Sequence, residues 1–203
     1  MKAFHIARTI ALPCAMGLAA CAPHASTSAP QLSSAPSAVA PDVTLVSDEG
    51  VLEPLRARVA RSPYTVFLYF ASHCPVQKAH DARVRALAEA YAPRGVAFVG
   101  LSTEDESDLH AENAAATARG LPFPIAADRA AALANAEGVE FSTHAILVDR
   151  TGRILYSGGL DSDRSHVTAD ATPHLQNALD DVLAGKAVRR PAAEALGCPL
   201  RKP

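Results

Sequence analysis

Two long apolar runs dominate the hydrophobic pattern of the chain. Residues 65–70 (TVFLYF) and 96–101 (VAFVGL) are rich in β-branched and aromatic side chains and show no polar alternation. Such runs are typical of strands that are buried on both faces. Shorter extended segments are expected at 43–46, 123–126, 145–148 and 154–156, with residues 149–152 (DRTG) forming a hairpin turn between the last two.

Helical periodicity is found between these strands. Val84, Leu87 and Tyr91 recur on one face of a helix that starts near Pro75 and ends before residues 93–95 (PRG). Further helices are expected at 51–60, 105–119, 129–136 and 172–184. The order β-α-β-α-β-β-α predicts an α/β fold with a central mixed sheet flanked by helices.

The first 41 residues follow neither pattern. Lys2 and Arg8 precede an apolar stretch, 9–20, that has the length of a signal-peptide core and is too short to span a bilayer. The sequence Leu18-Ala19-Ala20-Cys21 resembles the lipobox of bacterial lipoproteins, which implies acylation of Cys21. Because residue 22 is alanine and not aspartate, that resemblance favours the outer membrane, facing the periplasm. Ordinary secretion with cleavage nearby, or an uncleaved tail, is the alternative.

The composition of the next segment divides the rest of the chain. Residues 22–41 hold 6 Ala, 5 Ser and 4 Pro and no charge, which is typical of a disordered tether. We therefore expect a signal peptide at 1–20, a tether at 21–41, a folded domain at 42–187 and a tail at 188–203. The net charge of −2 and the lack of Lys/Arg clusters argue against nucleic acid as a partner.

Cys74 is the candidate reactive group. Cys14 leaves with a signal peptide and Cys21 carries lipid, so Cys74 and Cys198 are the thiols of the exported protein, in a compartment where disulfides persist. Cys74 follows a buried strand, and Pro75 fits the first position of the next helix. The helix dipole favours a thiolate there, whereas the alternative is an inert buried cysteine.

The segment Phe70-Ala71-Ser72-His73-Cys74-Pro75 resembles the active-site segment of thioredoxin-like redoxins of the AhpC/TSA/thioredoxin superfamily. The ending Gly197-Cys198-Pro199-Leu200 resembles that of an exported subgroup with a C-terminal Gly-Cys. The resemblance covers residues 42–203 and implies a thioredoxin-like fold with no cofactor. It implies Cys74 as the nucleophile, protein thiols or disulfides or small peroxides as the partners, and a substrate groove formed by His73, Pro75 and Thr143.

Cys198 is the candidate resolving thiol under this resemblance, in a tail flexible enough to reach back. A reversible Cys74–Cys198 disulfide, a static bridge and two free thiols are all compatible with the sequence.

Several positions depart from the family pattern. Gln77 replaces the second cysteine of the CxxC motif of thioredoxin. Phe67 and Ala71 stand where peroxiredoxins have proline and a threonine or serine. Thr143 takes the place of a cis-proline, and we expect a trans peptide there because a cis bond costs about 3–4 kcal/mol without proline.

These departures leave a second interpretation open, in which the chain is a catalytically degenerate module that binds copper or a client protein. Copper-delivering Sco-type proteins share the fold, but Lys78 and Phe141 replace their second cysteine and their histidine. His73, His80 and His144 are therefore not expected to form a metal site with Cys74. The acids at 104–108 are expected at a solvated helix start, and Asp161, Asp163, Arg164 and His166 in a polar loop.

Overall fold

The computed structural model describes residue 1, residues 39–104 and residues 108–203. Apart from Met1, the signal peptide expected at 1–20 lies outside the described residues, as do Cys21 and nearly all of the expected tether. Those assignments stay predictions. None of the helices in the described part of the chain has the length and hydrophobicity of a membrane span.

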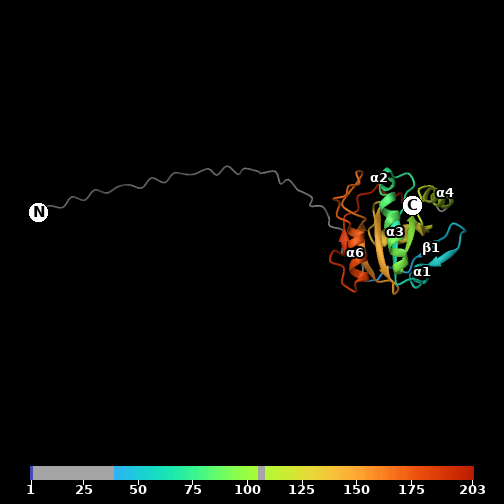
Figure 1. Cartoon of the computed structure of the whole chain (residues 1–203), viewed down its shortest axis with the longest axis horizontal. Coiled ribbons are helices and arrows are strands. Elements are labelled where there is room, and N and C mark those ends of the chain that lie inside the picture. Colours follow the sequence, from blue (N-terminus) through green and yellow to red (C-terminus); the bar gives the residue numbers. More distant parts are fainter. Residues whose placement is uncertain (2–38, 105–107) are drawn as a thin grey trace. The chain divides into compact units, whose positions relative to one another are not determined.

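One mixed sheet forms the centre of the fold (Figure 1). Its eight strands lie in the order β2-β1-β5-β4-β3-β6-β7-β8. Strands β3, β4 and β5 are parallel to one another, β8 is parallel to β7, and the other neighbours are antiparallel. The strands are β1 (Thr44–Val46), β2 (Leu52–Pro54), β3 (Tyr64–Tyr69), β4 (Val96–Ser102), β5 (Ile125–Asp128), β6 (His144–Asp149), β7 (Ile154–Gly159) and β8 (Ala192–Ala193).

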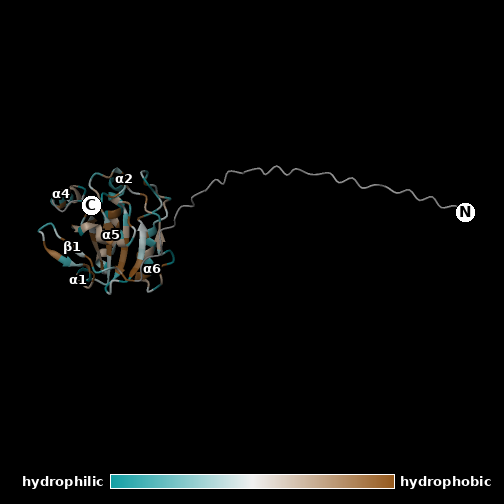
Figure 2. Ribbon diagram, turned by 180° about the vertical axis from the view of Figure 1, so that it is seen from behind, coloured by the Kyte–Doolittle hydropathy of each residue, from teal (hydrophilic) through white to brown (hydrophobic). Residues whose placement is uncertain are grey.

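Helices cover both faces of this sheet, which confirms the predicted fold class. The α-helices are α1 (Leu55–Val59), α2 (Pro75–Ala79), α3 (Asp81–Tyr91), α4 (Leu109–Ala118), α5 (Ala132–Ala136) and α6 (His174–Leu183), and the 3₁₀ helices are η1 (Ala92–Arg94) and η3 (Arg129–Ala131). In β3, Val66 and Leu68 pack with α3, α4 and α6, whereas Phe67 and Tyr69 pack with α1 and α5. Both faces of β3 are therefore core, which explains its unbroken apolar run. Figure 2 shows the same hydrophobic character in the central strands.

The prediction of one helix over residues 51–60 is wrong. Residues 52–54 form β2, which pairs with β1 after a turn in which Gly50 has φ +74°. Only Leu55–Val59 is helical, because Pro54 lacks a backbone N–H and stands in extended conformation just before the helix.

The long helix predicted from Pro75 to Tyr91 is interrupted at His80. Its ring nitrogen Nδ1 lies 2.8 Å from the Val76 carbonyl, so that its backbone N–H bonds the Gln77 carbonyl instead. This tighter bond ends α2, and α3 begins at Asp81.

The C-terminal tail is packed along the domain. Ala192–Ala193 adds β8 beside β7, where a Cβ on Gly158 would lie 2.3 Å from the Ala193 carbonyl oxygen. Further on, Phe141 and Pro199 form an isolated antiparallel bridge. The tail therefore reaches from the sheet edge to the end of the domain that carries α2.

Candidate active site

Cys74 stands at the junction of strand β3 and helix α2. It is the N-cap of α2 with Pro75 as the first helical residue, and the Gln77 backbone N–H donates to its Sγ at 3.3 Å. The residue is 1 % exposed and packs against Ala71 and Val76. A backbone N–H directed at the sulfur stabilises a thiolate more than a thiol.

Cys74 is joined to Cys198 by a disulfide. The two residues are 124 positions apart in sequence, yet their Cα atoms lie 5.8 Å apart, within the usual range for a disulfide. The sequence left open a reversible disulfide, a static bridge and two free thiols. The structure contains a disulfide, which the first two of these arrangements share. Cys198 is less buried than Cys74.

A glycine lets the tail reach Cys74. A Cβ on Gly197 would lie 1.8 Å from the Ser142 carbonyl oxygen, so no other residue type allows this approach of two backbones. Ser142 and Cys198 then pair, since the Ser142 N–H donates to the Cys198 carbonyl at 2.9 Å and the Cys198 N–H to Ser142 Oγ at 3.1 Å. The Leu200 N–H donates to the Glu140 carbonyl at 2.9 Å. These bonds hold the tail in place beside the disulfide.

Ser142 was not identified from the sequence. Its side chain is fully buried, and its hydroxyl donates to Cys74 Sγ at 3.2 Å. The one available signal was its place directly before Thr143, the residue aligned with the cis-proline of the family. Thr143 itself has φ +67°, a strained value for a β-branched residue, and the described residues contain no cis peptide bond, as expected for this position.

Gln77 occupies the position of the second cysteine of a CxxC motif and has a structural role there. Its side chain is 1 % exposed, donates to the Tyr69 carbonyl at 3.0 Å and accepts from the Ala71 N–H at 2.8 Å. The amide thereby satisfies two backbone groups in the segment that leads from β3 to Cys74. The side chain of Gln77 thus orders that segment, whereas its backbone N–H is the group that contacts the Cys74 sulfur.

Two residues of the predicted substrate groove are exposed, and the third is not. His73 and Pro75 are at the surface, and His73 Nδ1 lies 3.5 Å from a Glu104 carboxylate oxygen. Glu104 also pairs with Arg201 of the tail at 3.6 Å. Thr143 is 4 % exposed, so in the disulfide-bonded structure it offers little surface to a substrate.

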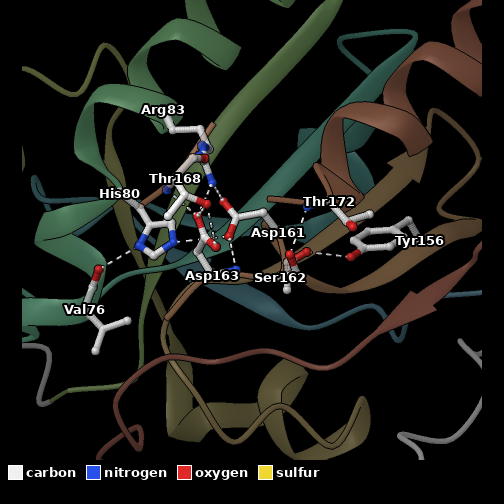
Figure 3. Close-up of polar contacts among 10 residues, drawn as sticks. Val76, His80, Arg83, Tyr156, Asp161, Ser162, Asp163, Thr168 and Thr172 are labelled. Atoms are coloured by element: carbon white, nitrogen blue, oxygen red, sulfur yellow. Dashed lines mark hydrogen bonds and ion pairs between the residues drawn. The ribbon is translucent and has the colours of Figure 1, made fainter. Parts of the chain in front are cut away.

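The other two histidines considered near Cys74 have separate partners. His144 is buried, and its Nε2 lies 2.8 Å from Ser157 Oγ. Burial lowers the pKa of His144 to about 4, so it is neutral at pH 7. His80 faces Asp161, as Figure 3 shows, and its Nε2 lies 3.3 Å from an Asp161 carboxylate oxygen. Among the described residues, no three His, Cys, Asp or Glu side chains gather as a metal site would require.

Asp161 lies in the polar loop that the sequence predicted, but its side chain is buried. It is 3 % exposed and accepts from His80 Nε2 at 3.3 Å, from the Asp163 N–H at 2.8 Å and from Arg83 (Figure 3). Burial alone would lower the pKa of His80, but the hydrogen bonds to Asp161 and the Val76 carbonyl raise it overall. Burial likewise acts to raise the pKa of Asp161, and the bonds from His80 and Arg83 lower it overall. The cluster fastens the loop after β7 to the junction of α2 and α3.

Comparison with known proteins places this geometry in a family. A redoxin family model matches residues 35–179. An uncharacterized conserved protein from Geobacillus kaustophilus has 25 % identity and a TM-score of 0.71, with 85 % of this chain and 94 % of that chain covered. A hypothetical protein from Sinorhizobium meliloti has 28 % identity and a TM-score of 0.70, with 83 % and 94 % covered. No curated protein sequence matches the chain.

Peroxidoxin BcpB from Mycobacterium tuberculosis shares the fold, with 19 % identity, a TM-score of 0.53 and coverage of 72 % of this chain and 96 % of that chain. The family model spans well over half of the chain, and the structure joins the candidate nucleophile to a second cysteine. The chain therefore belongs to the redoxin family and is a thiol oxidoreductase of the thiol-disulfide or peroxiredoxin-like class.

Proposed function

We propose that this chain is a lipid-anchored redox protein of the bacterial cell envelope that cycles between a Cys74–Cys198 disulfide and two thiols. The observation that carries the proposal is the contact between these two cysteines across 124 residues. The tail is aligned by hydrogen bonds to the backbone and the hydroxyl of Ser142 and by Gly197, so the second thiol is held where it can react. The lipobox-like residues ending at Cys21 support the anchor on the outer membrane.

Thiol-disulfide exchange with protein partners is the reaction that the site supports best. The Cys74 thiolate attacks a substrate disulfide, forms a mixed disulfide and releases one substrate thiol. Cys198 then attacks Cys74 Sγ and releases the second substrate thiol, which leaves the Cys74–Cys198 bridge and two electrons on the substrate. The Gln77 N–H and the Ser142 hydroxyl stabilise the Cys74 thiolate that makes the first attack.

Peroxide reduction is the second candidate. Ala71 supplies no hydroxyl to the site, but Ser142 places one at 3.2 Å from the Cys74 sulfur. In this reaction the Cys74 thiolate takes one oxygen of the peroxide and becomes a sulfenic acid, while the O–O bond breaks and the other oxygen leaves as an alcohol or water. The Cys198 thiol then attacks Cys74 Sγ, which forms the bridge with loss of water. We favour this redox cycle over the non-catalytic copper- or client-binding module, because Cys198 is placed where it can resolve an intermediate on Cys74.

The test is a thiol titration with peptide mass mapping of the reduced protein, after a stoichiometric disulfide substrate or peroxide and then after a dithiol. Formation of the Cys74–Cys198 linkage, followed by ready reduction, is the expected result. A bridge that resists the dithiol under native conditions, or thiols that stay free, would overturn the cycle. Cys198→Ser is the control, which should stop at a mixed disulfide or a sulfenate on Cys74.

The anchor is tested separately in cells. Metabolic labelling with a fatty acid should mark the wild-type chain and leave Cys21→Ser unlabelled. Equal labelling of both chains, or of neither, would contradict lipidation at Cys21 without affecting the redox cycle.

A further inference from the structure

We propose that Ser142 gives the two sulfurs unequal roles, so that a dithiol reductant attacks Cys198 and expels Cys74 as the thiolate. The inference rests on the proposed redox cycle and specifies how electrons enter it. It concerns the reducing half of the cycle, in which the bridge of the oxidised protein is opened.

The hydrogen bonds of Ser142 run in one direction. The Cys198 N–H donates to Ser142 Oγ at 3.1 Å, and Ser142 Oγ lies 3.2 Å from Cys74 Sγ. Since a hydroxyl has one proton and the first bond uses a lone pair, that proton is directed at Cys74. The chain of bonds polarises toward the sulfur that gains charge when the disulfide opens. The Gln77 N–H, at 3.3 Å, is a second donor to the same sulfur.

Access to the two sulfurs favours the same direction of attack. Cys74 is 1 % exposed and is enclosed by Ala71 and Val76. Cys198 is partly exposed, and it is followed in the tail by the exposed Pro199. Because thiolate attack requires approach to the sulfur itself, Cys198 is the sulfur that a protein partner can reach.

The step balances with the dithiol as the reductant. One reductant thiolate attacks Cys198 Sγ and forms a mixed disulfide while the Cys74–Cys198 bond breaks. The electron pair of that bond stays on Cys74 Sγ, where the Ser142 and Gln77 donors stabilise the thiolate. The second thiol of the reductant then attacks the reductant's first sulfur in the mixed disulfide and releases Cys198 as a thiol. The reductant is thereby oxidised by two electrons to a disulfide, and the bridge is reduced.

Gly197 makes this arrangement depend on the docked tail. The Ser142 hydroxyl oxygen accepts a hydrogen bond from the Cys198 N–H. This is possible because Gly197, which has no side chain, allows the tail to approach the Ser142 backbone closely. The same contact that aligns the disulfide thus also orients the hydroxyl toward Cys74.

The first experiment needs no variant. The oxidised wild-type protein is treated with excess glutathione, quenched in acid at short times, and digested with pepsin at acid pH before mass mapping. Glutathione on the Cys198 peptide, with the Cys74 peptide free, is the expected result. Glutathione predominantly on Cys74 would overturn the inference, whereas a bridge that is not opened at all would overturn the proposed function.

The second experiment removes the hydroxyl. Ser142→Ala should slow opening of the bridge by a dithiol about tenfold, because a charge-assisted hydrogen bond to the leaving thiolate is lost. It should also slow alkylation of reduced Cys74 at neutral pH by a similar factor. Alkylation of Cys198 should change little, which a general loss of structure would not produce.

Thr65→Val is the matched control, since it removes another fully buried hydroxyl, in β3, for which the described residues provide no hydrogen-bond partner. Its thiol kinetics should equal those of the wild type. Wild-type rates of bridge opening and of Cys74 alkylation in a folded Ser142→Ala protein would refute the role of the hydroxyl.

Discussion

Substitution of Gly197 by alanine should separate the tail from the active site. The added Cβ would lie 1.8 Å from the Ser142 carbonyl oxygen, 2.5 Å from its carbon and 2.7 Å from its Oγ. Two of these three atoms belong to the backbone, so rotation of a side chain cannot relieve the clash. The tail itself must move away from Ser142.

The magnitude follows from the bonds that this movement breaks. Two hydrogen bonds join Cys198 to Ser142, and each contributes about 1 kcal/mol net. A loss of about 2 kcal/mol lowers the population of the docked tail by about thirtyfold. The equilibrium constant for forming the bridge should fall by the same factor, which is a change of about 45 mV in reduction potential toward more oxidising values.

The assay is equilibration of the protein in glutathione buffers of known ratio, followed by acid quench and separation of the oxidised and reduced forms. Gly138→Ala is the control, since Gly138 also has a positive φ, of +64°, but a Cβ there meets nothing within 4 Å. An unchanged bridge equilibrium in Gly197→Ala would refute the argument that backbone contact with Ser142 positions Cys198.

Four further predictions concern buried polar groups. Gln77→Ala should lower the free energy of unfolding by about 2–4 kcal/mol in urea titrations, because two buried backbone groups lose their partner; a loss below about 0.5 kcal/mol would contradict this. Thr65→Val should raise the same quantity by about 1 kcal/mol, since its buried hydroxyl has no partner among the described residues, and a loss of stability would be inconsistent with that environment. Burial lowers the pKa of His144 to about 4, so its contribution to the free energy of unfolding is present above pH 6.5 and declines by about 3 kcal/mol as the pH falls to 4. His144→Gln should flatten this part of the plot of unfolding free energy against pH. The raised pKa of His80 acts in the opposite sense, because its contribution is fully present below pH 6.5 and is lost as pH rises through the folded pKa; Asp161→Asn should remove that slope, and an unaltered slope would exclude this pair as its origin.

The α/β class and the place of Cys74 were determined by local sequence. The runs 65–70 and 96–101 became the central strands β3 and β4, because a strand with core on both faces has an apolar pattern without alternation. Cys74 followed by Pro75 marked a helix start, because proline is favoured at the first helical position. These features depend on neighbouring residues and on burial alone.

Features that depend on contacts between distant segments were decided by the tertiary structure. Nothing near Asp161 in sequence shows that it meets His80 across 81 residues, and its polar loop is typical of solvent-exposed chain. Strand β2 was misjudged because three residues in a hairpin are too few to show a period.

The site itself divides in the same way. The sequence determined two candidate thiols, a missing CxxC partner at Gln77 and a glycine before Cys198. The tertiary structure decided that the thiols are joined and that Ser142 lies between them, bonded to one sulfur and to the backbone of the other residue. The reason is physical: helix and strand propensities act over a few residues, whereas a bond across 124 residues depends on how the tail packs against the completed sheet.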